Sequence, residues 1–171
     1  SAKVLPTKVI FLDVDGVLHT VTGRGGWLRT DCLLRLKRIV ETTGAGIVLS
    51  SNWRRSKSGM LNLKWVLKSH GMRVFDVTPV LGGAAASTRV REIFEWINVN
   101  DFRGRWIALD DLDLQFEKEE APLGHFIRTN AALGKNEHLS SPIQDNLIIS
   151  GEVAKQLTCK DSCLHLSPVP H

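Results

Sequence analysis

Residues 8–17 of the chain read Lys-Val-Ile-Phe-Leu-Asp-Val-Asp-Gly-Val. The stretch up to Leu12 is mostly apolar and rich in β-branched and aromatic side chains, which favours a strand buried on both faces over an amphipathic helix. Two carboxylates, Asp13 and Asp15, follow it almost directly. We therefore expect residues 8–13 to form the central strand of a sheet, with the aspartates at its carboxyl end.

Strand and helix patterns alternate along the rest of the chain. Short apolar runs predict further strands over residues 46–50, 72–75, 105–110 and 125–129. Apolar residues that recur every three or four positions predict helices over residues 31–43, from Leu61 to Gly71 and around Val90 to Ile97. The alternation predicts an α/β protein, a three-layer α/β/α sandwich with a mainly parallel sheet. We expect one domain over residues 1–171, with a last helix over 141–157 and a tail over 159–171.

Single residues within these helices carry more specific expectations. Gly44 is the expected stop of the first helix. Trp65 is expected on the face of the second helix that covers the sheet, and both Trp65 and Trp96 are expected in the core. Ser87 or Thr88 is the expected N-terminal cap of the third helix.

The composition is that of an ordinary globular protein, with 43% hydrophobic and 23% charged residues among 171. No stretch approaches the roughly 20 apolar residues of a membrane span, and residues 1–7 do not look like a secretory signal. Three cysteines cannot all pair, which fits a reducing compartment, so we expect an intracellular, cytoplasmic protein, with the nucleus as an alternative. The net charge of +4 is mild, and the sequence leaves the oligomeric state open.

Polar side chains gather where three of the predicted strands end: Asp13 and Asp15, then Ser50, Ser51 and Asn52, and then Asp110 and Asp111. Ligands of open parallel sheets bind at this carboxyl edge. Carboxylates about 4 Å apart repel by roughly 4 kcal/mol at an effective dielectric constant of 20, so such a group needs a cation or a proton. Oxygen ligands without histidine or cysteine suit a hard ion such as Mg²⁺.

The order of these motifs resembles the haloacid dehalogenase-like (HAD) hydrolase superfamily over about residues 8–130. Asp-Val-Asp-Gly-Val from Asp13 looks like its first signature, and Ser51-Asn52 looks like its second. Arg89, expected just before a helix, resembles the third, and Asp110-Asp111 resembles the acidic fourth. Three short segments are similar to those of small capless members of the superfamily, including phosphatase modules of nucleic-acid repair proteins. They are Ser-Ser-Asn-Trp-Arg, Arg-x-x-Glu-Ile-x-x-Trp and Leu-Asp-Asp-x-Asp-Leu.

This resemblance implies a Mg²⁺-dependent phosphomonoesterase that works through an aspartyl-phosphate intermediate. Asp13 is then the expected nucleophile, and Asp15 the general acid and base. Ser51 would hold the transferring phosphoryl oxygens, and Arg89 would offset their charge. The expected metal ligands are Asp13, Asp15 through its backbone carbonyl, Asp110 and Asp111.

Further substrate contacts are expected around the second motif. Ser50, Asn52 and Arg54 are the candidates, and the sequence does not decide which of the two adjacent serines binds phosphate. Arg54 has an equally good alternative as a structural residue paired with a carboxylate. His19 and His125 are expected near the rim of the site, where an ordinary surface histidine is favoured over a substrate contact.

The spacing of the motifs leaves no room for a large cap domain. Only a glycine-rich flap over residues 20–27 and one helix fit between Asp15 and Ser51, so we expect an open site for a bulky substrate such as a nucleic-acid end or a phosphoprotein. Trp27 or Trp53 could then stack a base, and nearby cations could contact phosphates: Arg24, Arg29, Arg54, Arg55 and Lys57. The alternatives are a small-metabolite phosphatase for a nucleotide or sugar phosphate, and a catalytically idle binding module on the same fold.

Overall fold

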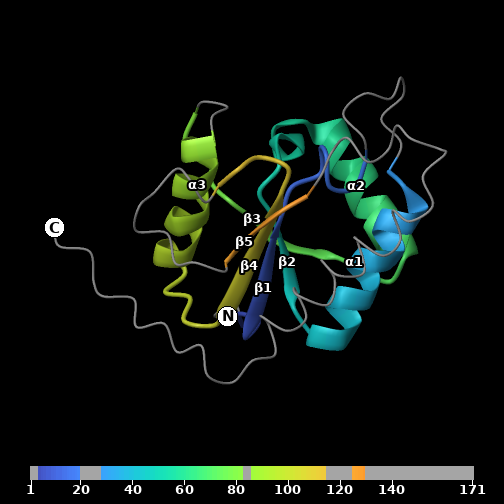
Figure 1. Ribbon diagram of the computed structural model, residues 1–171, viewed down its shortest axis with the longest axis horizontal. Helices are drawn as coiled ribbons and strands as arrows, with labels where there is room; N and C mark the ends of the chain where they lie inside the picture. Colours follow the sequence, from blue (N-terminus) through green and yellow to red (C-terminus); the bar gives the residue numbers. More distant parts are fainter. Residues whose placement is uncertain (1–3, 20–27, 83–85, 115–124, 130–171) are drawn as a thin grey trace, which may run out of the picture.

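The computed structural model describes residues 4–19, 28–82, 86–114 and 125–129, and strands and helices alternate through them (Figure 1). The elements are β1 (Lys8–Leu12), α1 (Thr30–Thr43), β2 (Gly46–Leu49), the 3-10 helix η1 (Asn52–Arg55), α2 (Lys57–Ser69), β3 (Val74–Val77), α3 (Ala86–Val99), β4 (Arg105–Asp110) and β5 (Phe126–Arg128). All strand pairs are parallel, in the order β3-β2-β1-β4-β5. The predicted α/β fold and the central place of the first strand are confirmed.

β1 is buried on both faces because its side chains supply two separate cores. Ile10 and Leu12 pack in one apolar cluster with residues of α1 and α2, whereas Val9 and Phe11 pack in the other with residues of α3. Figure 1 accordingly shows α3 on one side of the sheet and α1 and α2 on the other. The architecture is the predicted three-layer sandwich.

The first helix follows its prediction closely. Leu33, Leu36 and Ile39 are buried on its inner face. Gly44 ends the helix in the left-handed conformation, with φ of 69°, and its N–H donates to the carbonyl oxygen of Val40 at 2.8 Å. A residue with a Cβ would be strained at this φ, which is why glycine stops the helix here.

The apolar face of α2 differs from the predicted one. Leu63 and Leu67 are fully buried, whereas Leu61 is 69% exposed and Trp65 is 71% exposed. Two positions along a helix correspond to about 200° of rotation, so Leu61 and Trp65 lie on the opposite side from the buried pair. The prediction of a core role for Trp65 is therefore wrong, while the one for Trp96, which is 3% exposed, is confirmed.

Two element boundaries also differ from the prediction. β3 covers Val74–Val77 instead of residues 72–75, because the amide of Met72 still bonds to a carbonyl oxygen at the end of α2, at 2.8 Å. α3 begins at Ala86, so Ser87 and Thr88 lie inside its first turn and neither caps it.

Some expectations lie outside the described residues, namely the flap over 20–27, the helix over 141–157 and the tail over 159–171. Between β1 and β2 the described residues form one helix, α1, and no cap domain. None of the helices in the described part of the chain is long and apolar enough to cross a membrane.

Candidate active site

Residues at the carboxyl ends of three neighbouring strands meet at one edge of the sheet. β2, β1 and β4 are adjacent and parallel, so Ser50, Asp13 and Asp110 lie beside one another there. The N–H of Asp13 donates to the carbonyl oxygen of Leu109 at 2.9 Å, and the N–H of Ser50 donates to that of Leu12 at 2.9 Å. The strand pairing thus continues past the strand ends and fixes the backbone of both residues.

Three carboxylates form a compact group at this edge. Asp13, Asp110 and Asp111 each offer an oxygen atom within 4.8 Å of the other two. Burial and the neighbouring charge of Asp13 raise the pKa of Asp110 to about 7, and the same two causes raise the pKa of Asp111. A divalent cation would relieve this repulsion, and carboxylate oxygens are the ligands that Mg²⁺ prefers. The donor set therefore fits a hard metal ion.

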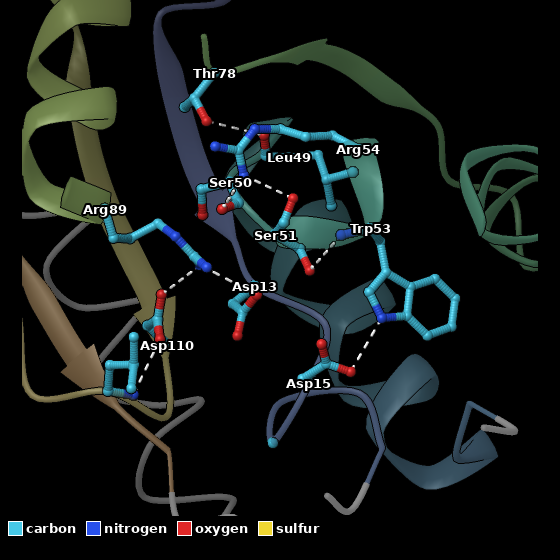
Figure 2. Close-up of polar contacts among 12 residues, drawn as sticks. Asp13, Asp15, Leu49, Ser50, Ser51, Trp53, Arg54, Thr78, Arg89 and Asp110 are labelled. Atoms are coloured by element: carbon cyan, nitrogen blue, oxygen red, sulfur yellow. Dashed lines mark hydrogen bonds and ion pairs between the residues drawn. The ribbon is translucent and has the colours of Figure 1, made fainter. Parts of the chain in front are cut away.

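Arg89 supplies a cation between two of these carboxylates. Its Nη1 lies 2.8 Å from Oδ2 of Asp110 and 3.1 Å from Oδ1 of Asp13, and its side chain is almost fully buried (Figure 2). The residue belongs to α3, near its start, and does not precede the helix as expected. The positive charge expected from the third motif thus lies between Asp13 and Asp110.

Asp15 is not a member of the three-carboxylate group. Its Oδ1 lies 2.6 Å from Nε2 of His19 and accepts a hydrogen bond from Nε1 of Trp53 at 3.0 Å. Figure 2 shows the carboxylate facing the Trp53 indole. The side chain is therefore held apart from the three carboxylates that could bind a metal ion.

Glycine is required at position 16 for a reason of space as well as conformation. Gly16 has φ of 74°, and a Cβ there would lie 2.6 Å from the side chain of Asp111. The turn after β1 and the end of β4 therefore approach closely at this point. Thr129 adds a further link, since its hydroxyl donates to the carbonyl oxygen of Gly16 at 3.1 Å.

Arg54 has its guanidinium group inside the protein. Nη1 donates to the carbonyl oxygens of Ser50 and Ser51 at 2.8 and 2.7 Å, and Nη2 donates to that of Pro79 at 3.2 Å. Nη2 also forms an ion pair with Glu92 at 2.5 Å, and the Arg54 side chain is only 3% exposed. These contacts favour the structural alternative for Arg54 over direct substrate binding, because they join the end of β2 to the segment after β3 and to α3.

The second motif lies between β2 and η1 and begins the 3-10 helix. Ser51 is buried, and its Oγ caps η1 by accepting a hydrogen bond from the N–H of Trp53 at 3.3 Å. A hydroxyl that accepts one bond still has a hydrogen to donate, so Ser51 can also bind a phosphoryl oxygen. Ser50 is buried beside it, and Asn52 is exposed at the start of η1.

The other predicted substrate contacts are scattered. Arg55 and Lys57 are exposed directly after Trp53, whereas Arg29 is paired with Asp31 at 2.8 Å. His125 stacks on Trp106, with ring centroids 4.2 Å apart. Arg24 and Trp27 lie outside the described residues.

The family described as the HAD domain in Swiss Army Knife RNA repair proteins matches residues 9–138. The chain belongs to this family. The match spans β1 to β5 and so includes every strand end that contributes to the site. No curated protein and no solved structure matches the chain. The resemblance to the HAD hydrolase superfamily, and to modules associated with nucleic-acid repair, is confirmed.

The sequence did not reveal every residue that supports this HAD site. Glu92 was missed, although its position three residues after Arg89 on a predicted helix indicates that the two share a helix face. His19 was expected to be an ordinary surface residue, and Trp53 was considered only as a base-stacking residue. His19 is only four residues from Asp15, but the backbone pairing that brings them together is not visible in the sequence, and Trp53 belongs to a different strand end.

Proposed function

We propose that this HAD domain is a metal-dependent phosphomonoester hydrolase that works through a phosphorylated Asp13. The observation that carries the proposal is the position of Asp13, which belongs to the carboxylate group and lies 3.1 Å from Nη1 of Arg89. A buried carboxylate beside a cation and a potential metal site is suited to attack a phosphate ester, because those charges offset the charge of the ester.

The residues that would hold Mg²⁺ are Asp13, Asp110, Asp111 and the backbone carbonyl of Asp15. When bound, the ion supplies positive charge that orients the Asp13 carboxylate and neutralises phosphoryl oxygens. The chain prepares one ligand in advance, because Oδ1 of Asp110 accepts a hydrogen bond from the N–H of Leu112 at 3.0 Å. That bond fixes the plane of the Asp110 carboxylate.

The protein side chains divide the remaining work. Asp13 attacks phosphorus in line, the bond to the leaving oxygen breaks, and Asp15 gives that oxygen a proton. Asp15 then takes a proton from the water that hydrolyses the acyl phosphate and frees Asp13. Throughout, Ser51 donates a hydrogen bond to a phosphoryl oxygen and Arg89 offsets the charge that develops in the transition state.

We propose a phosphorylated nucleic-acid end as the substrate. Three observations support this choice: the family is that of a domain in RNA repair proteins, the described residues contain no cap domain, and exposed cations follow two of the elements that end at the site. Arg55 and Lys57 follow η1, and Arg128, whose side chain is 64% exposed, ends β5. The alternative is a small nucleotide or sugar phosphate, which equal activity on free mononucleotides would favour.

The test is phosphate release from oligonucleotides phosphorylated at either end, with Mg²⁺ or with a chelator. We expect the wild-type protein to release phosphate only with Mg²⁺, and Asp13→Asn to be inactive because the amide keeps the shape but is no nucleophile. Substantial turnover by Asp13→Asn would overturn the mechanism. A wild-type protein that binds oligonucleotides but hydrolyses no phosphate ester would be the idle binding module.

A further inference from the structure

Two side chains outside the proposed catalytic group hold the Asp15 carboxylate. Nε2 of His19 lies 2.6 Å from Oδ1 of Asp15, and the indole N–H of Trp53 donates to the same oxygen at 3.0 Å. Within the described part of the chain, both bonds fall on Oδ1 and none falls on Oδ2. The two carboxylate oxygens are therefore unequal, although Asp15 itself is 44% exposed.

The turn after β1 places His19 against Asp15. The N–H of Gly16 donates to the carbonyl oxygen of His19 at 2.9 Å, and Asp15 and His19 form an isolated β-bridge. This pairing folds the chain back on itself and brings the imidazole over the carboxylate. The His19 side chain is only 13% exposed, so its ring is held largely inside the protein.

Trp53 approaches the same carboxylate from the end of β2. It lies in η1, which Ser51 caps by accepting the Trp53 N–H at 3.3 Å. The indole also packs against the apolar core and against His19, with ring centroids 5.7 Å apart. Asp15 is thus held from two strand ends, and one of them carries the serine expected to bind phosphate.

The chemistry of the donors decides which oxygen of Asp15 can carry a proton. The indole N–H can only donate, and an ionised carboxylate can only accept, so the His19 nitrogen that faces it carries a hydrogen. With two donors directed at Oδ1, a proton added to the carboxyl group belongs on Oδ2. The carboxyl group is also held in one orientation, as proton transfer in a transition state requires.

We infer that His19 and Trp53 are positioning residues that make Oδ2 of Asp15 the proton-transfer atom. This inference rests on the proposed phosphatase function. The proton leaves Oδ2 for the departing oxygen as the phosphorus–oxygen bond breaks, and Oδ2 later takes a proton from the attacking water. Oδ1 stays bonded to His19 and Trp53 in both steps.

The test uses the leaving group, because a nitrophenolate departs without a proton whereas an alkoxide needs one. We compare kcat/KM of Trp53→Phe and His19→Phe on para-nitrophenyl phosphate and on glycerol phosphate, since kcat/KM reports the steps up to departure of the leaving group. Both variants should lose about 10-fold or more on glycerol phosphate and less than about 3-fold on the nitrophenyl ester, as expected for loss of general acid catalysis. His19→Gln, which retains an N–H donor, should recover part of the loss.

The control is Trp65→Phe, which removes an indole from the exposed face of α2. It should leave kcat/KM unchanged on both esters. Circular dichroism and thermal melting check that each variant is folded. Because His19 and Trp53 are replaced separately, the test still stands if one of the two variants is unstable. Equal losses on both esters, or no loss on either, would overturn the positioning role while leaving the phosphatase in place. Absence of activity in the wild-type protein would instead reject the proposed function, and the inference with it.

Discussion

Asp110 is a single residue whose surroundings make stability depend on pH. Burial and the charge of Asp13 raise its pKa from 3.8 to about 7, although Arg89 opposes the shift. Between these two values the folded protein keeps a proton that the unfolded chain has already lost, so the metal-free fold loses stability as the pH rises. In the presence of a chelator, we expect the free energy of unfolding to fall by up to about 1.4 kcal/mol per pH unit across this window.

Urea unfolding at a series of pH values measures this slope. Asp110→Asn cannot titrate, so its curve should be flatter than that of the wild-type protein. Mg²⁺ should also flatten the wild-type curve, because it binds the ionised carboxylate and therefore stabilises the fold more at higher pH. If the curves of the wild type and Asp110→Asn ran parallel in chelator, the raised pKa of Asp110 would not be the cause of the pH dependence.

Glu92 is the counter-charge of the buried Arg54 and also lies near Arg89. Its Oε2 pairs with Arg54 at 2.5 Å and lies 4.0 Å from Nε of Arg89, and its Oε1 accepts the N–H of Leu81 at 3.1 Å. Glu92→Gln keeps the shape and the bond to Leu81 but leaves Arg54 without its counter-charge. We expect a loss of about 3–5 kcal/mol in the free energy of unfolding, since removing one partner of a buried ion pair leaves the other charge uncompensated.

Glu95→Gln is the matched control, because Glu95 is an exposed residue of the same helix. If Glu92→Gln cost no more than Glu95→Gln in urea unfolding, the ion pair would not support the fold. Because Arg54 is buried against Glu92, reversing its charge would destabilise the fold, so such a variant cannot report on substrate binding.

Among the elements, the turn after β1 depends most directly on one glycine. Gly16→Ala adds a Cβ at a φ of 74° and 2.6 Å from the Asp111 side chain, so Asp111 must move. We expect a loss of about 1–3 kcal/mol from backbone strain and, if the carboxylate group binds Mg²⁺ as proposed, a weaker affinity for the ion. Thermal melting and calorimetric titration with Mg²⁺ measure the two effects.

Gly44→Ala separates strain from steric clash. Gly44 has a similar φ of 69°, but an added Cβ would have no neighbour within 4 Å. This variant should therefore lose stability while its Mg²⁺ titration matches that of the wild-type protein. The same Mg²⁺ affinity in both alanine variants would show that Gly16 does not shape the metal site.

Elements were predictable where burial imposes a simple pattern. β1, β2 and β4 are continuous apolar runs because both faces of the sheet are covered, and α1 has one inner face followed by Gly44. α2 was assigned the wrong inner face because apolar residues occur on both of its sides, and only packing shows that Leu63 and Leu67 are the buried ones.

The candidate site was also predictable only in part. The strand-end motifs are local, so the sequence brought Asp13 and Asp110 to one edge once the sheet was known to be parallel. The bond from Trp53 to Asp15 and the burial of Arg54 against Glu92 join separate elements. Such contacts depend on side-chain directions that no spacing within one segment encodes.

At the scale of the whole molecule, the proposed substrate predicts which positive charges should matter. The net charge is +4, and Arg55 and Lys57 are exposed directly beyond Trp53, whose indole contacts Asp15. We expect a nucleic-acid end in the proposed site to reach these two cations through its neighbouring phosphates, and a small ester not to reach them. Exposed cations near the site should therefore affect KM for oligonucleotides without affecting the chemical step.

Arg55→Glu combined with Lys57→Glu tests this arrangement. We expect KM for a phosphorylated oligonucleotide to rise about 10-fold or more, and the slope of log KM against log salt to fall by up to about 1.4, as two lost single-strand phosphate contacts predict. Kinetics on para-nitrophenyl phosphate should stay unchanged, because the reacting residues are untouched. Lys64→Glu with Lys68→Glu makes the same change in net charge on the exposed side of α2, farther along the helix, and should have a much smaller effect. Equal effects of the two pairs would mean that only total charge matters, and impairment of both substrates by the first pair would leave the phosphatase proposal but remove its nucleic-acid substrate.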